Sequence, residues 1–219
     1  MADTTLSGPS AGPAAGGPAK QLVILLHGVG SDGDDLIALA PYFATRLPDA
    51  AFLAPHAPAP FDMAPMGRQW FSLQDRHPQK LLAEARAVAP VLNAFIDGNL
   101  AERGLTDNEL VLIGFSQGTM MALHVGLRRP KPCAALLGYS GLLIAPDRLP
   151  DELTARPRVL LVHGEEDETV VPDFLPLAEN ALRLVGVPVL SLMCKNLGHS
   201  INDEGLIAGI EFAAQGFGL

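Results

Sequence analysis

The sequence predicts an α/β protein whose central, mostly parallel sheet carries helices on both faces. Short apolar runs alternate along the chain with segments of helical spacing, which is the pattern of a parallel sheet. The first run, residues 21–26, is continuously apolar, as expected for a central strand that is covered on both faces. At residues 114–118 an apolar run, a G-x-S-x-G turn and a helical segment follow one another, which is typical of a nucleophile elbow.

The first half of the chain contains two expected strands and two expected helices. After the strand over residues 21–26, aspartates at positions 32, 34 and 35 supply N-terminal charge for a helix through about Leu47. Residues 50–54 form the second strand. The proline-rich segment 55–78 is expected to be a long functional loop without regular structure. Helical spacing then runs from Leu81 to Leu100, with a possible kink at Pro90 and a terminator at Gly104.

The second half repeats the alternation. The expected strands are residues 110–113, 134–137, 158–162 and 188–193. A helix begins at Gln117, a second has its apolar face between Phe174 and Val185, and the last spans about Asn202 to Ala214. Ser200 and Asp203 resemble a capping box for this last helix.

Composition divides the chain into two parts. Residues 1–19 are rich in Gly, Pro, Ala and Ser and are expected to form a flexible leader with no role in the fold. Residues 20–219 are expected to form a single α/β domain, without a cap domain between the core strands.

Charge and composition exclude several classes of function. The net charge of -9, with no basic run to offset it, argues against nucleic acid or an anionic membrane as the partner. No apolar stretch approaches the roughly 18–20 residues that span a bilayer, so we expect no stable membrane insertion. Cys133 and Cys194 lie in or beside strand-like runs and are expected to be reduced core residues. Since no secretory signal is visible, we expect a cytoplasmic enzyme. We expect it to be either a monomer or a homodimer.

Ser116 is the candidate nucleophile, and it needs a base and an orienting acid. In folds with such an elbow the chain order is serine, acid, histidine. His199, after the last expected strand, fits the base, whereas His124 lies on the elbow helix and His163 precedes the acidic loop. The acid must come from the loop after residues 158–162, and residue types alone leave five candidates open there: Glu165, Glu166, Asp167, Glu168 and Asp173.

The sequence resembles the phospholipase/carboxylesterase family of small α/β-hydrolases, which includes bacterial carboxylesterases and acyl-protein thioesterases. The resemblance spans nearly all of the chain after residue 19. The matching segments are Leu26-His27-Gly28-Val29-Gly30, Gly67-Arg68-Gln69-Trp70-Phe71, Gly114-Phe115-Ser116-Gln117-Gly118, His163-Gly164-Glu165-Glu166-Asp167 with Val170-Val171-Pro172, and Gly198-His199. One departure is Thr119, where the family usually has a further glycine.

The resemblance implies an α/β-hydrolase fold with Ser116 as nucleophile, Asp167 as acid and His199 as base. In this fold the oxyanion hole uses the N–H after the nucleophile, here Gln117, and one from an early loop, which the resemblance places at Val29. The implied activity is hydrolysis of short- to medium-chain carboxylic esters through an acyl-enzyme. The alternative is an acyl-protein thioesterase or lysophospholipase with the same triad. The expected partner is a small-molecule ester or thioester, with no cofactor and no metal.

Apolar residues near the expected carboxyl ends of strands suggest an open, shallow acyl-binding groove beside Ser116. We assign substrate binding to residues of three loop regions: Met66, Trp70, Phe71, Leu142, Leu143 and Phe174.

Two alternatives come from other classes. Residues 28–33 match G-x-G-x-x-G after a strand, the fingerprint of dinucleotide binding. The next strand ends Leu53-Ala54-Pro55 without the acid that would bind a ribose, and the nearby aspartates would repel a pyrophosphate. A non-catalytic binding module with a hydrolase shape is the second alternative, because fold alone does not guarantee function.

Overall fold

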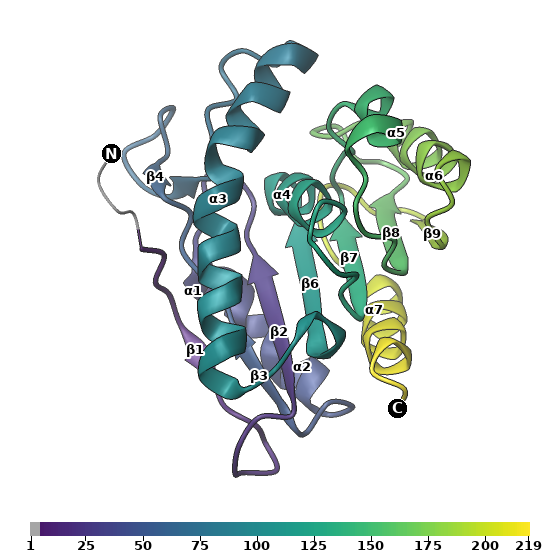
Figure 1. The fold of residues 1–219 in the computed structure, drawn as a ribbon. Coiled ribbons are helices and arrows are strands. Elements are labelled where there is room, and N and C mark those ends of the chain that lie inside the picture. The colour runs from purple at the N-terminus through teal and green to yellow at the C-terminus, as the bar shows by residue number, and fades with distance from the viewer. Residues whose placement is uncertain (1–4) are drawn as a thin grey trace.

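A seven-stranded sheet forms the centre of the computed structural model, which describes residues 5–219 (Figure 1). In chain order its strands are β1 (Ser10–Ala11), β2 (Gln21–Leu26), β3 (Ala50–Leu53), β6 (Leu110–Phe115), β7 (Ala135–Tyr139), β8 (Val159–Gly164) and β9 (Val189–Cys194). Their order across the sheet is β1-β3-β2-β6-β7-β8-β9. Each neighbouring pair is parallel except β1 and β3. The predicted α/β fold with a mostly parallel sheet is therefore confirmed.

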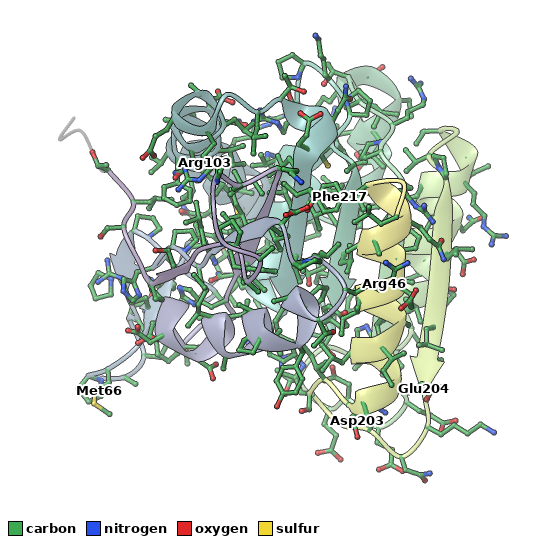
Figure 2. The ribbon with its side chains drawn as sticks, turned by 90° about the horizontal axis from the view of Figure 1, so that it is seen from below. Arg46, Met66, Arg103, Asp203, Glu204 and Phe217 are labelled. Carbon is green, nitrogen blue, oxygen red and sulfur yellow. The ribbon has the colours of Figure 1, made fainter. Side chains whose placement is uncertain are left out.

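Helices pack on both faces of this sheet. The α-helices are α1 (Gly33–Leu36), α2 (Ala40–Ala44), α3 (Pro78–Arg103), α4 (Gln117–Gly126), α5 (Leu149–Glu152), α6 (Phe174–Leu184) and α7 (Asp203–Gly216). Three short 3-10 helices are η1 (Ile37–Leu39), η2 (Asp107–Glu109) and η3 (Pro146–Arg148). One apolar core joins the sheet to α3, α4 and α6, and a second joins its other face to α1, α2 and α7. Figure 1 shows α3 and α4 in front of the sheet, and Figure 2 shows α7 and the α1–α2 segment on the opposite side. Among the described residues, no helix combines the length and apolar character that crossing a bilayer requires.

The helix expected over residues 32–47 is divided into three short pieces, α1, η1 and α2. Its predicted start is correct, because the Asp32 carboxylate accepts the N–H groups of Asp34 and Asp35. The long α3 continues through Pro90 and ends at Gly104, which has the left-handed conformation (φ 66°) of a helix terminator.

Two local expectations are wrong. The final helix, α7, is capped by Asn202, whose side chain accepts the N–H of Gly205 at 2.9 Å, and not by Ser200. The segment 55–78 is also not free of regular structure, because β4 (Ala59–Pro60) and β5 (Arg68–Gln69) form a small antiparallel pair within it.

The N-terminal segment takes part in the fold. β1 pairs with the outer side of β3, and the carbonyl oxygens of Ser7 and Pro9 accept the N–H groups of His56 and Ala54. Leu6 is buried in the core that contains α3. The prediction that residues 1–19 form a leader with no role in the fold is therefore wrong for residues 6–11; residues 1–4 lie outside the described part. β1 pairs with β3 through backbone N–H and C=O groups, which every composition supplies, so the side-chain composition of this segment did not indicate the pairing.

Candidate active site

A cavity of about 620 Å³ opens beside Ser116 at the carboxyl ends of the central strands. Its volume lies within the range of roughly 300–1,000 Å³ that is usual for small-molecule sites. The lining residues come from the loops after β2, β5, β6, β7 and β8 and from α3, α4, η3 and α6: Val29, Leu73, Arg76, Pro78, Leu81, Ser116, Met120, Leu142, Leu143, Ile144, Ala145, Pro146, Asp147, Thr169, Val170, Val171, Phe174, Leu177 and Ala178.

Ser116 lies at the turn between β6 and α4 with a strained backbone. Its φ of 54° and ψ of -115° are unusual for a residue with a side chain, and nucleophile elbows hold their serine in such a conformation. Its N–H donates to the carbonyl of Tyr139 at 2.8 Å, and its carbonyl accepts the N–H of Thr119 at 3.0 Å. These bonds fix the turn from both sides.

The two glycines of the elbow are required by close backbone approach. A side chain at Gly118 would collide with the backbone of Leu26 at the end of β2, and one at Gly114 would collide with Gly118 itself. Thr119, where the family usually has glycine, is accommodated. Its hydroxyl oxygen lies 2.8 Å from the carbonyl oxygens of both Gly114 and Tyr139, which share its one proton.

Asp167 and His199 are joined directly. The Nδ1 of His199 lies 2.7 Å from Oδ2 of Asp167, and because a carboxylate accepts, the imidazole donates. Oδ1 of Asp167 accepts the N–H groups of Thr169 and Val170, both at 2.9 Å. His163 also lies near, with its Nε2 3.3 Å from Oδ2 of Asp167. The carboxylate is thus held on both oxygens.

These contacts keep Asp167 ionised although it is buried. Burial alone would raise the pKa of this carboxyl, but the hydrogen bonds from His199 and from the N–H groups of Val170 and Thr169 outweigh burial. The pKa of Asp167 is therefore held below its ordinary value. The result is a fixed negative charge behind the His199 imidazole.

His199 lies next to the elbow. Its ring centroid is 4.9 Å from that of Phe115, the residue before Ser116 in the chain. The Phe115 ring thus places His199 beside the elbow, and within residues 5–219 no hydrogen bond joins His199 to the Ser116 hydroxyl. Ser116 lines the cavity, whereas His199 and Asp167 are not among its lining residues.

The loop after β2 lies against the same elbow. A side-chain carbon placed on Gly28 would be only 3.3 Å from Cβ of Ser116, so this loop passes directly beside the serine. Val29, the next residue, lines the cavity together with Ser116. In residues 5–219 the N–H groups of Val29 and Gln117 have no protein acceptor. Both are therefore free to bind an anionic oxygen.

The residues predicted to bind substrate separate into two groups. Leu142, Leu143 and Phe174 line the cavity. Met66 does not, because its side chain is 81% exposed and points away from the body of the protein (Figure 2). Trp70 and Phe71 are also absent from the lining, because both side chains are buried in the core. The assignment of these last three residues to the groove is corrected accordingly.

Several lining residues were missed in the sequence. Met120 lies one helical turn after Ser116, so the spacing of α4 could have identified it. Ile144 comes from the loop after β7, Val171 from the loop after β8 and Leu177 from the first turn of α6, and no local signal distinguishes them from ordinary packing. Arg76 and Asp147 add opposite charges to a mainly apolar lining.

His124, His163 and the two cysteines are buried side chains outside the proposed triad. His163 donates from Nε2 to the carbonyl of Val170 at 2.7 Å, as predicted for a residue that satisfies a backbone group. His124 is buried on α4 and its Nδ1 has no partner within residues 5–219. Cys133 and Cys194 are buried, as predicted for core residues, and they lie in different apolar cores.

The glycine-rich segment 28–33 does not provide an anion site at the start of α1. Asp32 already caps that helix with its carboxylate, and a second acidic residue, Asp34, lies in the first turn. A pyrophosphate would have to replace one negative group and approach another. The dinucleotide alternative is disfavoured on this geometry.

A sequence model of the phospholipase/carboxylesterase family matches residues 13–215. The chain belongs to this family. As a member it is an esterase-type hydrolase, as the sequence predicted. It is 29% identical over 189 residues to Esterase YpfH of Escherichia coli K12, which covers 86% of this chain and 80% of that protein. It is also 29% identical over 203 residues to acyl-protein thioesterase 1 of Schizosaccharomyces pombe, covering 87% and 88% of the two chains.

The crystal structure of esterase PE8 is similar over almost the whole family domain. It aligns with a TM-score of 0.92 and 40% identity, over 96% of this chain and 99% of that chain. A carboxylesterase from Mesorhizobium loti, at 24% identity and a TM-score of 0.73, shares the fold.

Proposed function

We propose that this protein is a serine hydrolase that cleaves carboxylic esters of short to medium acyl chains through an acyl-enzyme. The observation that carries the proposal is the hydrogen bond between buried Asp167 and His199, located beside the strained elbow at Ser116. Family membership supports the same reaction class.

In the proposed mechanism Asp167 fixes the tautomer of His199. With Nδ1–H donated to the carboxylate, Nε2 is left as the atom that accepts the proton of Ser116. Ser116 then attacks the substrate carbonyl. Protonated His199 gives its proton to the leaving alcohol and later activates water, which releases the acid from the acyl-enzyme. The serine–histidine hydrogen bond of such sites often shortens only when substrate is bound.

The oxyanion of the tetrahedral intermediate is assigned to the N–H groups of Val29 and Gln117. Gln117 is the first residue of α4, so the positive end of that helix supports the same charge. Each such donor is typically worth about 3 kcal/mol in the transition state.

A thioester substrate is the second candidate. The cavity is apolar enough for an acyl chain, and the fission yeast relative is an acyl-protein thioesterase by name. The same triad serves both leaving groups, because the thiolate leaves without a different acid or base. A cytoplasmic location and a monomeric or homodimeric state stay predictions from composition.

The test is hydrolysis of p-nitrophenyl acetate and of an S-acyl thioester by the wild-type protein and by Ser116→Ala. We expect loss of both activities in the variant, with an unchanged circular dichroism spectrum. Retained turnover in folded Ser116→Ala would remove the serine from the mechanism. No turnover of any ester by the wild type would favour the non-catalytic binding module.

A further inference from the structure

One segment, residues 67–71, bonds to both loops that carry the proposed oxyanion donors, and we call it the strap. It contains β5 and precedes the long α3. Arg68 of the strap forms two backbone hydrogen bonds with the loop after β2. Its carbonyl accepts the N–H of Gly30 at 2.8 Å, and its N–H donates to the carbonyl of Ser31 at 2.8 Å. A side chain at Gly67 would collide with Gly30, so the two segments are in direct backbone contact.

Trp70 of the strap reaches the other end of the same loop. Its indole N–H donates to the carbonyl of His27 at 2.9 Å, and both residues are almost fully buried. The His27 ring extends this link, because Nδ1 donates to the Gly28 carbonyl at 2.7 Å while Nε2 accepts the N–H of Ala57 at 2.9 Å. Burial lowers the pKa of His27, in keeping with this neutral tautomer. Val29 therefore lies between two residues, His27 and Gly30, that are each bonded to the strap.

The strap also holds the elbow, through the side chain of Gln117. Its Oε1 accepts the N–H of Trp70 at 2.9 Å, and its Nε2 donates to the carbonyl of Phe71 at 2.7 Å. The Gln117 side chain is fully buried, so these two bonds are not in competition with water. The residue whose backbone N–H is one proposed donor is thus anchored by its own side chain.

We propose that Trp70 and the Gln117 side chain are positioning residues, which hold the N–H groups of Val29 and Gln117 at one fixed separation. This inference rests on the proposed function, because it needs an oxyanion at that place. Two donors from distant segments can bind one oxygen only if their spacing is set in advance, and preorganised donors of this kind stabilise the transition state without reorganisation. Trp70, predicted from the sequence to contact substrate, acts in this assignment through the backbone of the oxyanion loop.

Two variants test the strap. Trp70→Phe removes the indole N–H and keeps an aromatic ring, and Gln117→Met removes both side-chain bonds and keeps the length. We expect kcat for p-nitrophenyl acetate to fall by about tenfold to a hundredfold in each, with KM changed by less than about twofold. The inhibition constant of a boronic acid, which forms a tetrahedral adduct with a nucleophilic serine, should rise by a similar factor.

The control is Phe43→Leu, which shortens a buried aromatic residue in the opposite core, on α2. It should lower the Tm and leave kcat and the boronic acid affinity unchanged. The proposal is overturned if Trp70→Phe behaves like this control, or if it raises KM with kcat intact. If Gln117→Met does not fold, Trp70→Phe decides alone. Turnover by Ser116→Ala would instead contradict the proposed function, so the two failures are distinguishable.

Discussion

The Nδ1–H of His199 donates to Oδ2 of Asp167 over 2.7 Å, although the two residues lie on loops that follow different strands. Asp167 is buried, whereas the glutamates beside it, Glu165, Glu166 and Glu168, are exposed. Of these four acids, Asp167 is therefore the one whose interaction with the imidazole is not screened by water.

We expect Asp167→Asn to lower kcat for a p-nitrophenyl ester by about a thousandfold to ten-thousandfold. An amide can donate to Nδ1 and so stabilise the wrong tautomer of the imidazole, as in other triads. The matched control is Glu168→Gln, which neutralises an exposed neighbour and should change kcat by less than about twofold. A large loss in the control, with Asp167→Asn still active, would move the acid to the glutamate.

The stability of the protein should fall in mild acid because of His124. Burial, assisted by the nearby positive charge of Arg128, lowers the pKa of His124 from its ordinary 6.5 to about 4. Between these values the unfolded chain binds a proton that the folded protein does not. The free energy of unfolding is therefore complete above pH 6.5 and decreases as the pH falls towards 4, by roughly 3 kcal/mol from this group. The pKa of His27 is lowered by burial as well, so it adds to the same trend.

The measurement is urea unfolding of the wild type and of His124→Leu at several pH values between 4 and 7. The variant removes the buried imidazole whose pKa is lowered, so its unfolding free energy should be less sensitive to acid. His77→Gln, at an exposed position before α3, should keep the wild-type dependence. Equal acid sensitivity in the wild type and His124→Leu would contradict this account.

Thr119 and Gly138 should be energetically coupled. A side-chain carbon on Gly138 would lie 2.5 Å from Cγ2 of Thr119, and the next nearest atom is 3.3 Å away. We expect Gly138→Ala to cost about 1–3 kcal/mol in unfolding free energy through overcrowding. Combining it with Thr119→Ser, which removes that methyl and keeps the hydroxyl bonds, should recover most of the loss. Additive costs in a double-mutant cycle would show that the clash is not with Thr119.

The cavity should set the acyl-chain preference. Leu142 lines it after β7, so Leu142→Trp should reduce its volume. We expect kcat/KM for p-nitrophenyl octanoate to fall by about tenfold relative to that for the acetate. Leu184→Trp, at a position that is 78% exposed and outside the lining, serves as the control. An unchanged octanoate-to-acetate ratio in Leu142→Trp would show that the acyl chain binds elsewhere.

The sequence was sufficient to predict those features in which a local residue pattern specifies a backbone conformation. The elbow is such a place, because the turn at Ser116 requires glycine at positions 114 and 118, and the G-x-S-x-G motif contains both glycines. The N-cap at Asp32 and the terminator at Gly104 are equally local. Each depends on one residue type at one backbone conformation.

The sequence was insufficient where a role depends on packing between distant segments. Residue types alone left five acidic candidates open after β8; the family resemblance implied Asp167, and the fold shows that its side chain is buried. Trp70 is apolar and lies in a loop, so it resembled a groove residue, yet its indole bonds to His27 across the core. Residues 6–11 carry little apolar pattern, and their place beside β3 depends on backbone pairing.

The most direct test of the central assignment is covalent labelling of the wild-type protein with a fluorophosphonate, followed by mass spectrometry of its peptides. Such reagents react with a serine that is activated by a neighbouring base. The account predicts one adduct, on Ser116, and a strongly reduced rate of labelling in Asp167→Asn. An adduct on a different residue, or a folded and ester-hydrolysing protein that takes no label at Ser116, would contradict it.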